Sequence, residues 1–183
     1  MKPTMTSYSD LRRAGATFFS ELGEWSYDEW ARLNSKFFGN ANEPGPILWG
    51  LTPHGGSVGY YSPMHNSITM HTSLVHKSTD APWGIKNLGK KYASDVLLHE
   101  MIHQHIHQMK LPVGRYSSHN NKSWCDEVNR IGALLGFKNM LRAEPIKQKR
   151  VEGKVTWYVK PGCMPRKEFA TFPHSQRPTP QNG

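Results

Sequence analysis

The sequence predicts an α+β domain that is followed by a basic extension. Three observations support this fold class: a long helical pattern near the N-terminus, a run of short strand-like segments in the middle, and two amphipathic helical patterns after them. The 183 residues suffice for one domain with a sizeable core and are too few for two ordinary domains. We therefore assign residues 8–137 to the domain and residues 138–183 to the extension.

The first part of the chain is expected to contain one long helical region and three strands. Residues 8–38 have helical character with a break near Gly23, and YDEWARLNSKFF places Trp30, Leu33 and Phe37 on one apolar face. The segment NANEPGP, with its Pro and Gly residues, ends this helix. The segments ILWGL, SVGYY and NSITMHTSLV follow and predict a small antiparallel sheet.

Residues 93–110 give the clearest helical pattern in the chain. Leu98, Ile102, Ile106 and Met109 recur at helical spacing and form an apolar stripe. The Leu-Pro pair that follows ends this helix. After a loop, SWCDEVNRIGALLGF has apolar residues at the same spacing and predicts a second helix.

Most of the positive charge lies in the extension. Residues 138–183 hold 10 Lys and Arg residues against 3 Asp and Glu residues, which is +7 of the net +9 of the whole chain. Within it, IKQKRV and KVTWYVK flank a Glu-Gly pair and predict a hairpin over residues 146–160. Such a charge asymmetry is a common footprint of nucleic-acid binding, and a solvated basic tail is the alternative interpretation.

Cysteine usage and apolar runs exclude several classes of protein. Cys125 and Cys163 cannot form a disulfide framework or a zinc ribbon, since no Cys-x-x-Cys pair is present. The N-terminus lacks the apolar run of a signal peptide, and no apolar stretch approaches the roughly 20 residues that span a bilayer. We therefore expect a cytoplasmic protein with no membrane partner.

The sequence His99-Glu100-Met101-Ile102-His103 is an HExxH motif on the clearest helix. Residues four apart lie one turn above each other on a helix, so both imidazoles can reach one metal ion. Glu100 follows His99 directly, where its carboxylate can take a proton from a metal-bound water. The pattern predicts one Zn²⁺ per chain, with His99 and His103 as ligands and Glu100 as the catalytic base.

The third ligand is less clearly marked in the sequence. The metzincin pattern requires a histidine at position 109, which is Met109 here, so that class is excluded. His119 lies just before the second helix and is the favoured ligand, with Glu127 on that helix as the competitor.

Three polar neighbours of the motif are given other roles. His105 projects into the apolar stripe and is expected to be buried and hydrogen-bonded. His107 is expected to be exposed, with a place at the rim of the site as the alternative. Asp95 is expected to cap the helix, with a supporting role behind the metal ligands as the alternative.

The segments DVLLHEMIH and SSHNNKSWCDEVNRIG resemble the SprT-like metallopeptidases, the family of the Spartan DNA–protein crosslink proteases. Upstream, WARLNSKFF, ILWG, VGYY and NSITMHTSL resemble the helix and small sheet of that family, so the resemblance covers residues 25–137. It implies a minimal zincin-like domain that hydrolyses peptide bonds, in which a histidine at the start of the second helix, here His119, completes the zinc site. This chain departs from many members because it has no cysteines for a zinc ribbon.

The resemblance and the basic extension together predict two macromolecular partners: a protein substrate, and DNA with single strands preferred. The best phosphate-binding candidates flank the hairpin turn, and Trp157 is the best candidate for stacking on a base, although it could instead anchor the hairpin core. An association with the nucleoid or nucleus would follow from DNA binding. The phosphate-binding candidates are Lys147, Lys149, Arg150 and Lys154.

Two further features of catalysis are expected from the loops and strands. Tyr116 or Arg115, between the two metal-bearing helices, could stabilise the oxyanion. A substrate could add as a strand along the edge of NSITMHTSLV. The competing interpretations are a zinc peptidase unconnected with DNA, and a non-catalytic DNA-binding or antirestriction-type protein with a structural zinc. Glu100 argues against the latter, since a structural site needs no base.

Overall fold

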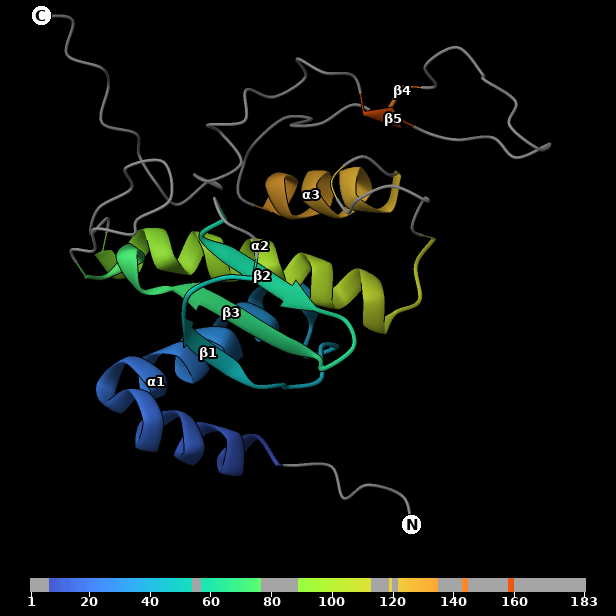
Figure 1. Ribbon diagram of the computed structural model, residues 1–183. Coiled ribbons are helices and arrows are strands. Elements are labelled where there is room, and N and C mark those ends of the chain that lie inside the picture. Colours follow the sequence, from blue (N-terminus) through green and yellow to red (C-terminus); the bar gives the residue numbers. More distant parts are fainter. Residues whose placement is uncertain are drawn as a thin grey trace, which may run out of the picture.

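The computed structural model describes residues 7–53, 57–76, 89–112, 119, 122–134, 143–144 and 158–159. Over these residues the fold is α+β, with three α-helices, a three-stranded mixed sheet and one short two-stranded pairing (Figure 1). In chain order the elements are α1 (Tyr8–Phe38), β1 (Ile47–Gly50), β2 (Gly59–Ser62), β3 (Ser67–His71), the 3₁₀ turn η1 (Thr72–Leu74), α2 (Gly89–Gln108), α3 (Lys122–Leu134), β4 (Ala143–Glu144) and β5 (Tyr158–Val159).

Helix α1 is a hairpin of two helical arms (Figure 1). The break lies at Ser20, whose φ of 50° and ψ of −137° are not helical, three residues before the Gly23 near which it was predicted. Arg12 on the first arm pairs with Asp28 on the second at 2.8 Å, although 16 residues of one continuous helix would separate them by about 24 Å. Gly23 instead permits close approach of the arms, because a Cβ there would lie 2.0 Å from the Gly15 carbonyl oxygen.

The sheet has the strand order β1-β3-β2. The β2–β3 pair is antiparallel as predicted, whereas β1 runs parallel to β3, so the prediction of a fully antiparallel sheet is wrong. Strand β2 lies on the far side of β3 from β1 and runs opposite to both, so β1 and β3 point the same way. Strand β3 is therefore central. Because it pairs with β1 on one side and with β2 on the other, NSITMHTSLV does not offer the open edge that was expected to bind a substrate.

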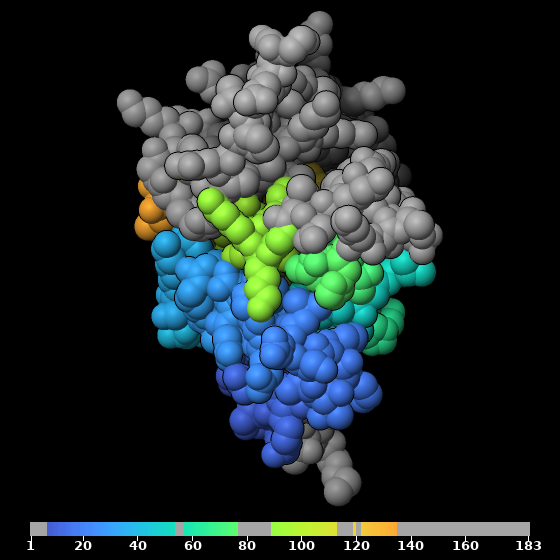
Figure 2. Space-filling view, turned by 90° about the vertical axis from the view of Figure 1, so that its left-hand side faces the viewer, coloured from blue at the N-terminus to red at the C-terminus, as the bar shows by residue number. Residues whose placement is uncertain are grey.

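The core lies between one face of this sheet and the helices α1 and α2. Trp49, Ile68 and Met70 point to that face and are buried, whereas Leu48, one residue along β1, is 43% exposed on the other. Both helices contact the sheet and each other. On the side shown in Figure 2 the first part of α2 (yellow-green) lies against α1 (blue). Helix α2 therefore runs through the centre of the domain and holds the residues of the motif against the sheet.

Helix α2 ends as the sequence predicts. Lys110 adopts a positive φ of 52°, and the Leu111 N–H donates to the Ile106 carbonyl oxygen at 3.0 Å, which closes the last turn. Its start differs from the prediction, because α2 already begins at Gly89. Asp95 is therefore not a helix cap: it lies inside the helix and is only 1% exposed.

The described part of the extension contains one antiparallel pairing. Ala143 lies opposite Val159 and Glu144 lies opposite Tyr158, and β5 contacts α3. Strand β4 precedes the expected hairpin of residues 146–160, of which only Tyr158 and Val159 are among the described residues. Among the helices that the structure describes, none combines the length and apolar character needed to cross a bilayer.

Candidate metal centre

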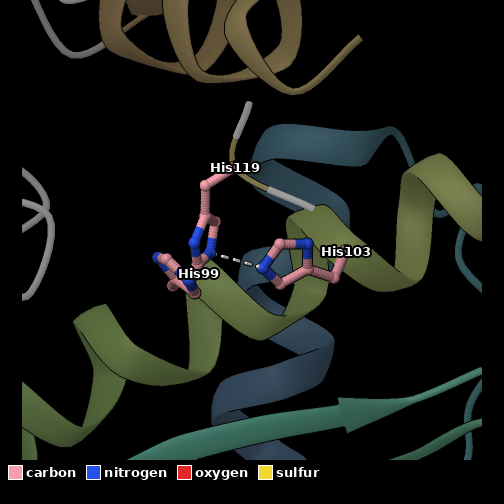
Figure 3. A group of neighbouring side chains, drawn as sticks. All are labelled: His99, His103 and His119. Carbon is pink, nitrogen blue, oxygen red and sulfur yellow. Dashed lines mark hydrogen bonds between the residues drawn. The ribbon is translucent and has the colours of Figure 1, made fainter. Parts of the chain in front are cut away.

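Three histidines from two parts of the chain converge beside α2. His99 and His103 stand one turn apart on this helix, and His119 reaches them from the segment before α3 (Figure 3). The His119 Nε2 lies 2.9 Å from the Nε2 of His99 and 2.9 Å from the Nε2 of His103. One potential ligand atom from each residue lies within 4.8 Å of the other two. The predicted trio is thus close enough to bind a metal ion.

Hydrogen bonding among the three rings does not by itself account for this arrangement. An imidazole nitrogen either donates one proton or accepts with one lone pair, so the His119 Nε2 cannot serve both neighbours at once. A cation at the centre can accept a lone pair from each ring. Zinc–nitrogen bonds of about 2.0–2.1 Å in a tetrahedral site separate two nitrogens by about 3.3 Å. This separation lies between the 2.9 Å from His119 to each neighbour and the 4.8 Å within which all three ligand atoms fall.

The surroundings keep these imidazoles neutral, which is the form that binds metal. Burial lowers the pKa of His99 and of His103 well below the usual value, and the neighbouring rings lower it further. His119 is the most exposed of the three residues, but its ring packs against other rings, and burial there lowers its pKa to about 4. At neutral pH all three rings are therefore free of a competing proton.

Trp124 forms an aromatic wall behind the three histidines. Its side chain is completely buried, and its ring lies 4.2 Å from that of His103 in a stacked geometry. The rings of His99 and His119 meet it edge-on at 4.8 Å and 4.7 Å. The helical spacing of the sequence indicates a buried residue here, but nothing local in the sequence shows that it touches every ring of the trio. Trp124 therefore restricts the orientation of all three imidazoles.

Glu100 lies on the side of α2 that faces β2. It is only 5% exposed, and the Tyr61 backbone N–H donates a hydrogen bond to its carboxylate. Burial raises the pKa of Glu100 to about 8, and the hydrogen bond from Tyr61 partly opposes this rise. A cation bound by the histidines would favour the ionised carboxylate. The site thus combines three neutral nitrogen donors with one carboxylate of raised basicity.

The other polar candidates stand apart from the trio. Glu127 pairs with Arg130 at 2.7 Å on α3 and is not part of the cluster. His105 is hydrogen-bonded as predicted, with its Nδ1 2.7 Å from the Asn42 Oδ1, but it is half-buried and not fully buried. His107 is exposed as predicted and lies 3.0 Å from the Tyr61 hydroxyl through its Nδ1.

Several predicted residues fall outside the described part of the chain, so the structure places none of them relative to the trio. These are the oxyanion candidates Tyr116 and Arg115 and the DNA-binding candidates Lys147, Lys149, Arg150, Lys154 and Trp157.

No protein-family model matches the chain, and comparisons with curated proteins and with solved structures find no match either. The function must therefore be inferred from the geometry of the site and from the motif that produces it.

Proposed function

We propose that this chain is a zinc-dependent metallopeptidase of the HExxH type, with a minimal zincin-like domain related to the SprT-like family. One observation supports this proposal above all others: His99, His103 and His119 converge on one point while Glu100 lies buried on the adjoining side of the same helix. Three protein ligands leave one position of a tetrahedral ion for water or substrate, as catalytic zinc sites do. A structural site would have no use for the adjacent carboxylate.

In the proposed hydrolysis of a peptide bond, a bound zinc ion and the side chains of this chain would have separate roles. A bound zinc supplies a Lewis acid that polarises the scissile carbonyl and makes water more acidic. Glu100 accepts the proton of the attacking water and passes it to the leaving nitrogen of the peptide bond. Its burial makes this carboxylate a stronger base than an exposed glutamate, with a pKa of about 8 before a cation binds. Trp124 and the packed rings exclude water from the side of the histidines that faces α3.

Among the described strands, none pairs with the edge of β2 that faces away from β3. We propose this edge, in place of the β3 edge, as the one to which an extended substrate adds. The His71 N–H donates to the Val58 carbonyl oxygen at 2.8 Å, so alternate residues of β2 bond to β3. Gly59 and Tyr61 then direct their backbone groups away from β3, and the Tyr61 N–H meets the Glu100 carboxylate. A peptide paired along this edge would pass beside the proposed base.

We further propose that the substrates are DNA-associated proteins, because the extension concentrates +7 of the net charge in residues 138–183. A peptidase that works without DNA is the alternative. The two differ in a simple measurement: the DNA-associated enzyme binds single-stranded DNA with an affinity that falls steeply with salt, and charge reversal at Lys147, Lys149, Arg150 and Lys154 weakens that binding without loss of zinc.

The decisive experiment uses the zinc-loaded protein and a DNA-binding protein as substrate, with and without single-stranded DNA. We expect fragments from the wild type and none from Glu100→Gln, which keeps the size of the side chain and removes the base. Zinc content and thermal stability should remain close to wild type in this variant. Glu127→Gln, on the neighbouring helix, is the matched control and should still cleave. Cleavage by Glu100→Gln at the wild-type rate would rule out the mechanism.

A further inference from the structure

We infer that Gly59 is a positioning residue for Glu100: the missing side chain on β2 creates the space that the carboxylate occupies. The geometric part of this inference stands on the structure, and its catalytic consequence rests on the proposed function. A side chain at position 59 would face α2, so this position acts on Glu100 only through the space that the missing side chain leaves.

The space at Gly59 is filled by two side chains of α2. A Cβ added there would lie 2.5 Å from the Glu100 Oε1, 3.0 Å from the Glu100 Cγ and 2.6 Å from the Val96 Cγ1. Real Cβ atoms essentially never approach other heavy atoms below 3.0 Å, so any larger residue would have to displace something. Val96 is 4% exposed and Glu100 is 5% exposed, so both are enclosed where they stand.

Backbone conformation does not explain the glycine. Among the described residues the glycines with positive φ are Gly39 and Gly89, so Gly59 has a conformation that other residues adopt. Glycine within a strand is unfavourable because it gives up more conformational freedom and has no side chain to pack. The requirement at this position is therefore space rather than φ.

A substitution here is expected to move the carboxylate rather than the backbone. The nearest atom is the end of a flexible side chain, which can rotate away, whereas the closest atoms to Gly23 and Gly45 are backbone atoms. Displacement of the Glu100 carboxylate separates it from the Tyr61 N–H and from the water that it activates. Misplacement of a reacting group by about 1 Å can cost about 100-fold in rate.

Gly50 offers a matched control in β1, at the opposite edge of the sheet. A Cβ added to Gly50 meets no atom of the described residues within 4 Å. Gly59→Ala and Gly50→Ala therefore make the same chemical change in two short edge strands, and differ in whether the new methyl group meets Glu100.

The first test is steady-state proteolysis by the zinc-loaded full chain. Gly59→Ala should lower kcat about 100-fold with KM and zinc content nearly unchanged, while Gly50→Ala should stay close to wild type. Glu100→Asp, which also shifts the carboxylate, should lower kcat in the wild type but add little to Gly59→Ala, because both changes remove the same positioning. In the Gly50→Ala background, Glu100→Asp should lower kcat by the same factor as it does in the wild type. If the role of Gly59 were purely structural, the losses in kcat would multiply in both double variants, Glu100→Asp with Gly59→Ala and Glu100→Asp with Gly50→Ala. That result would overturn the inference.

The second test does not depend on activity. Gly59→Ala should lower the melting temperature, and this loss should be smaller in the Glu100→Ala background because the two Glu100 atoms that meet the methyl group are then absent. An equal loss in both backgrounds would show that Gly59 does not make room for Glu100. If the smaller loss is found and the wild type cleaves no protein, the placement of Glu100 stands and the proposed function fails.

Discussion

Helix α2 carries two polar clusters that differ in how their hydrogen bonds are matched. The trio of His99, His103 and His119 brings nitrogen toward nitrogen, with one Nε2 shared between two neighbours. The second cluster surrounds Gln104, where each donor meets an acceptor: the Trp30 indole donates to its Oε1 at 3.0 Å, and its Nε2 donates to the Asn66 Oδ1 at 3.0 Å. The first arrangement brings together three nitrogens close enough to bind a metal ion, whereas in the second each donor meets an acceptor.

The cluster around Gln104 links α2 to the segment between α1 and β1 through hydrogen bonds. The Gln104 Nε2 also donates to the Glu43 carbonyl oxygen at 3.1 Å, and the Gln108 Oε1 accepts from the Glu43 N–H at 2.8 Å. Helix α2 thus contributes glutamines that stabilise the fold and histidines that form the candidate site. On this comparison we propose ligand binding for the histidine cluster and structural support for the glutamine cluster.

The largest expected effect comes from removal of a ligand. His119→Ala should weaken zinc retention by more than the roughly 10–100-fold that loss of a supporting residue costs, since it removes one of three protein nitrogens. Zinc bound per chain after dialysis against a weak chelator measures this effect. Glu127→Ala should keep the metal, because Glu127 is engaged with Arg130. The reverse pattern would show that the wrong residue has been assigned as ligand.

The matched cluster should respond to a similar deletion with a loss of stability and not of metal. Gln104→Met keeps the length of the side chain but leaves the buried Trp30 N–H without its acceptor, which should lower the free energy of unfolding by about 2 kcal/mol. Urea denaturation of the zinc-bound protein measures the change. If zinc affinity also fell sharply, the two clusters would not be independent.

The metal-free protein should be most stable near pH 6.5. Lowered pKa values of His99, His103 and His119 make the unfolded chain bind more protons below 6.5, so stability falls as the pH drops from there toward about 4. Glu100 has a raised pKa, so the folded chain holds its proton longer and stability falls as the pH rises from 4.5 to about 8. Below pH 6.5 the lowered pKa values of the three histidines outweigh the raised pKa of the one glutamate, and as the pH rises above it the contribution of the glutamate becomes the larger one.

Thermal melts of the chelated protein between pH 4 and 8 check this profile. In Glu100→Gln the decline above pH 6.5 should disappear while the decline below it remains. A decline above pH 6.5 that survives in this variant would assign it to another group.

The smallest effect is expected far from both clusters, at the bend of α1. Ser20 has a positive φ that glycine adopts without strain, so Ser20→Gly should stabilise the protein by about 1 kcal/mol in thermal or urea denaturation. Thr17, one turn before the bend, lies in regular helix and serves as the control, because Thr17→Gly should destabilise by a similar amount. Both variants should bind zinc as the wild type does, and a change in zinc binding would link this bend to the site.

The sequence was most informative where structure is local. The spacing of His99 and His103 on an amphipathic helix follows from helix geometry alone, and the structure brings them together with His119 as predicted. The direction of β1 was wrongly predicted because pairing across the sheet depends on the path between strands, which no local pattern encodes. The contact of Trp124 with the trio and the interior position of Asp95 likewise depend on where whole helices lie.

The placement of His119 has one more consequence, for the cohesion of the chain. His103 and His119 are 16 residues apart, and they belong to the end of one helical segment and the approach to the next. An ion held by both closes a loop, as a disulfide does, and restricts the unfolded chain while it joins α2 to the start of α3. Because such an ion binds the folded state, the stability of the domain should rise with free zinc concentration by RT ln(1 + [Zn]/Kd). The ion is then a cross-link that can be withdrawn by a chelator.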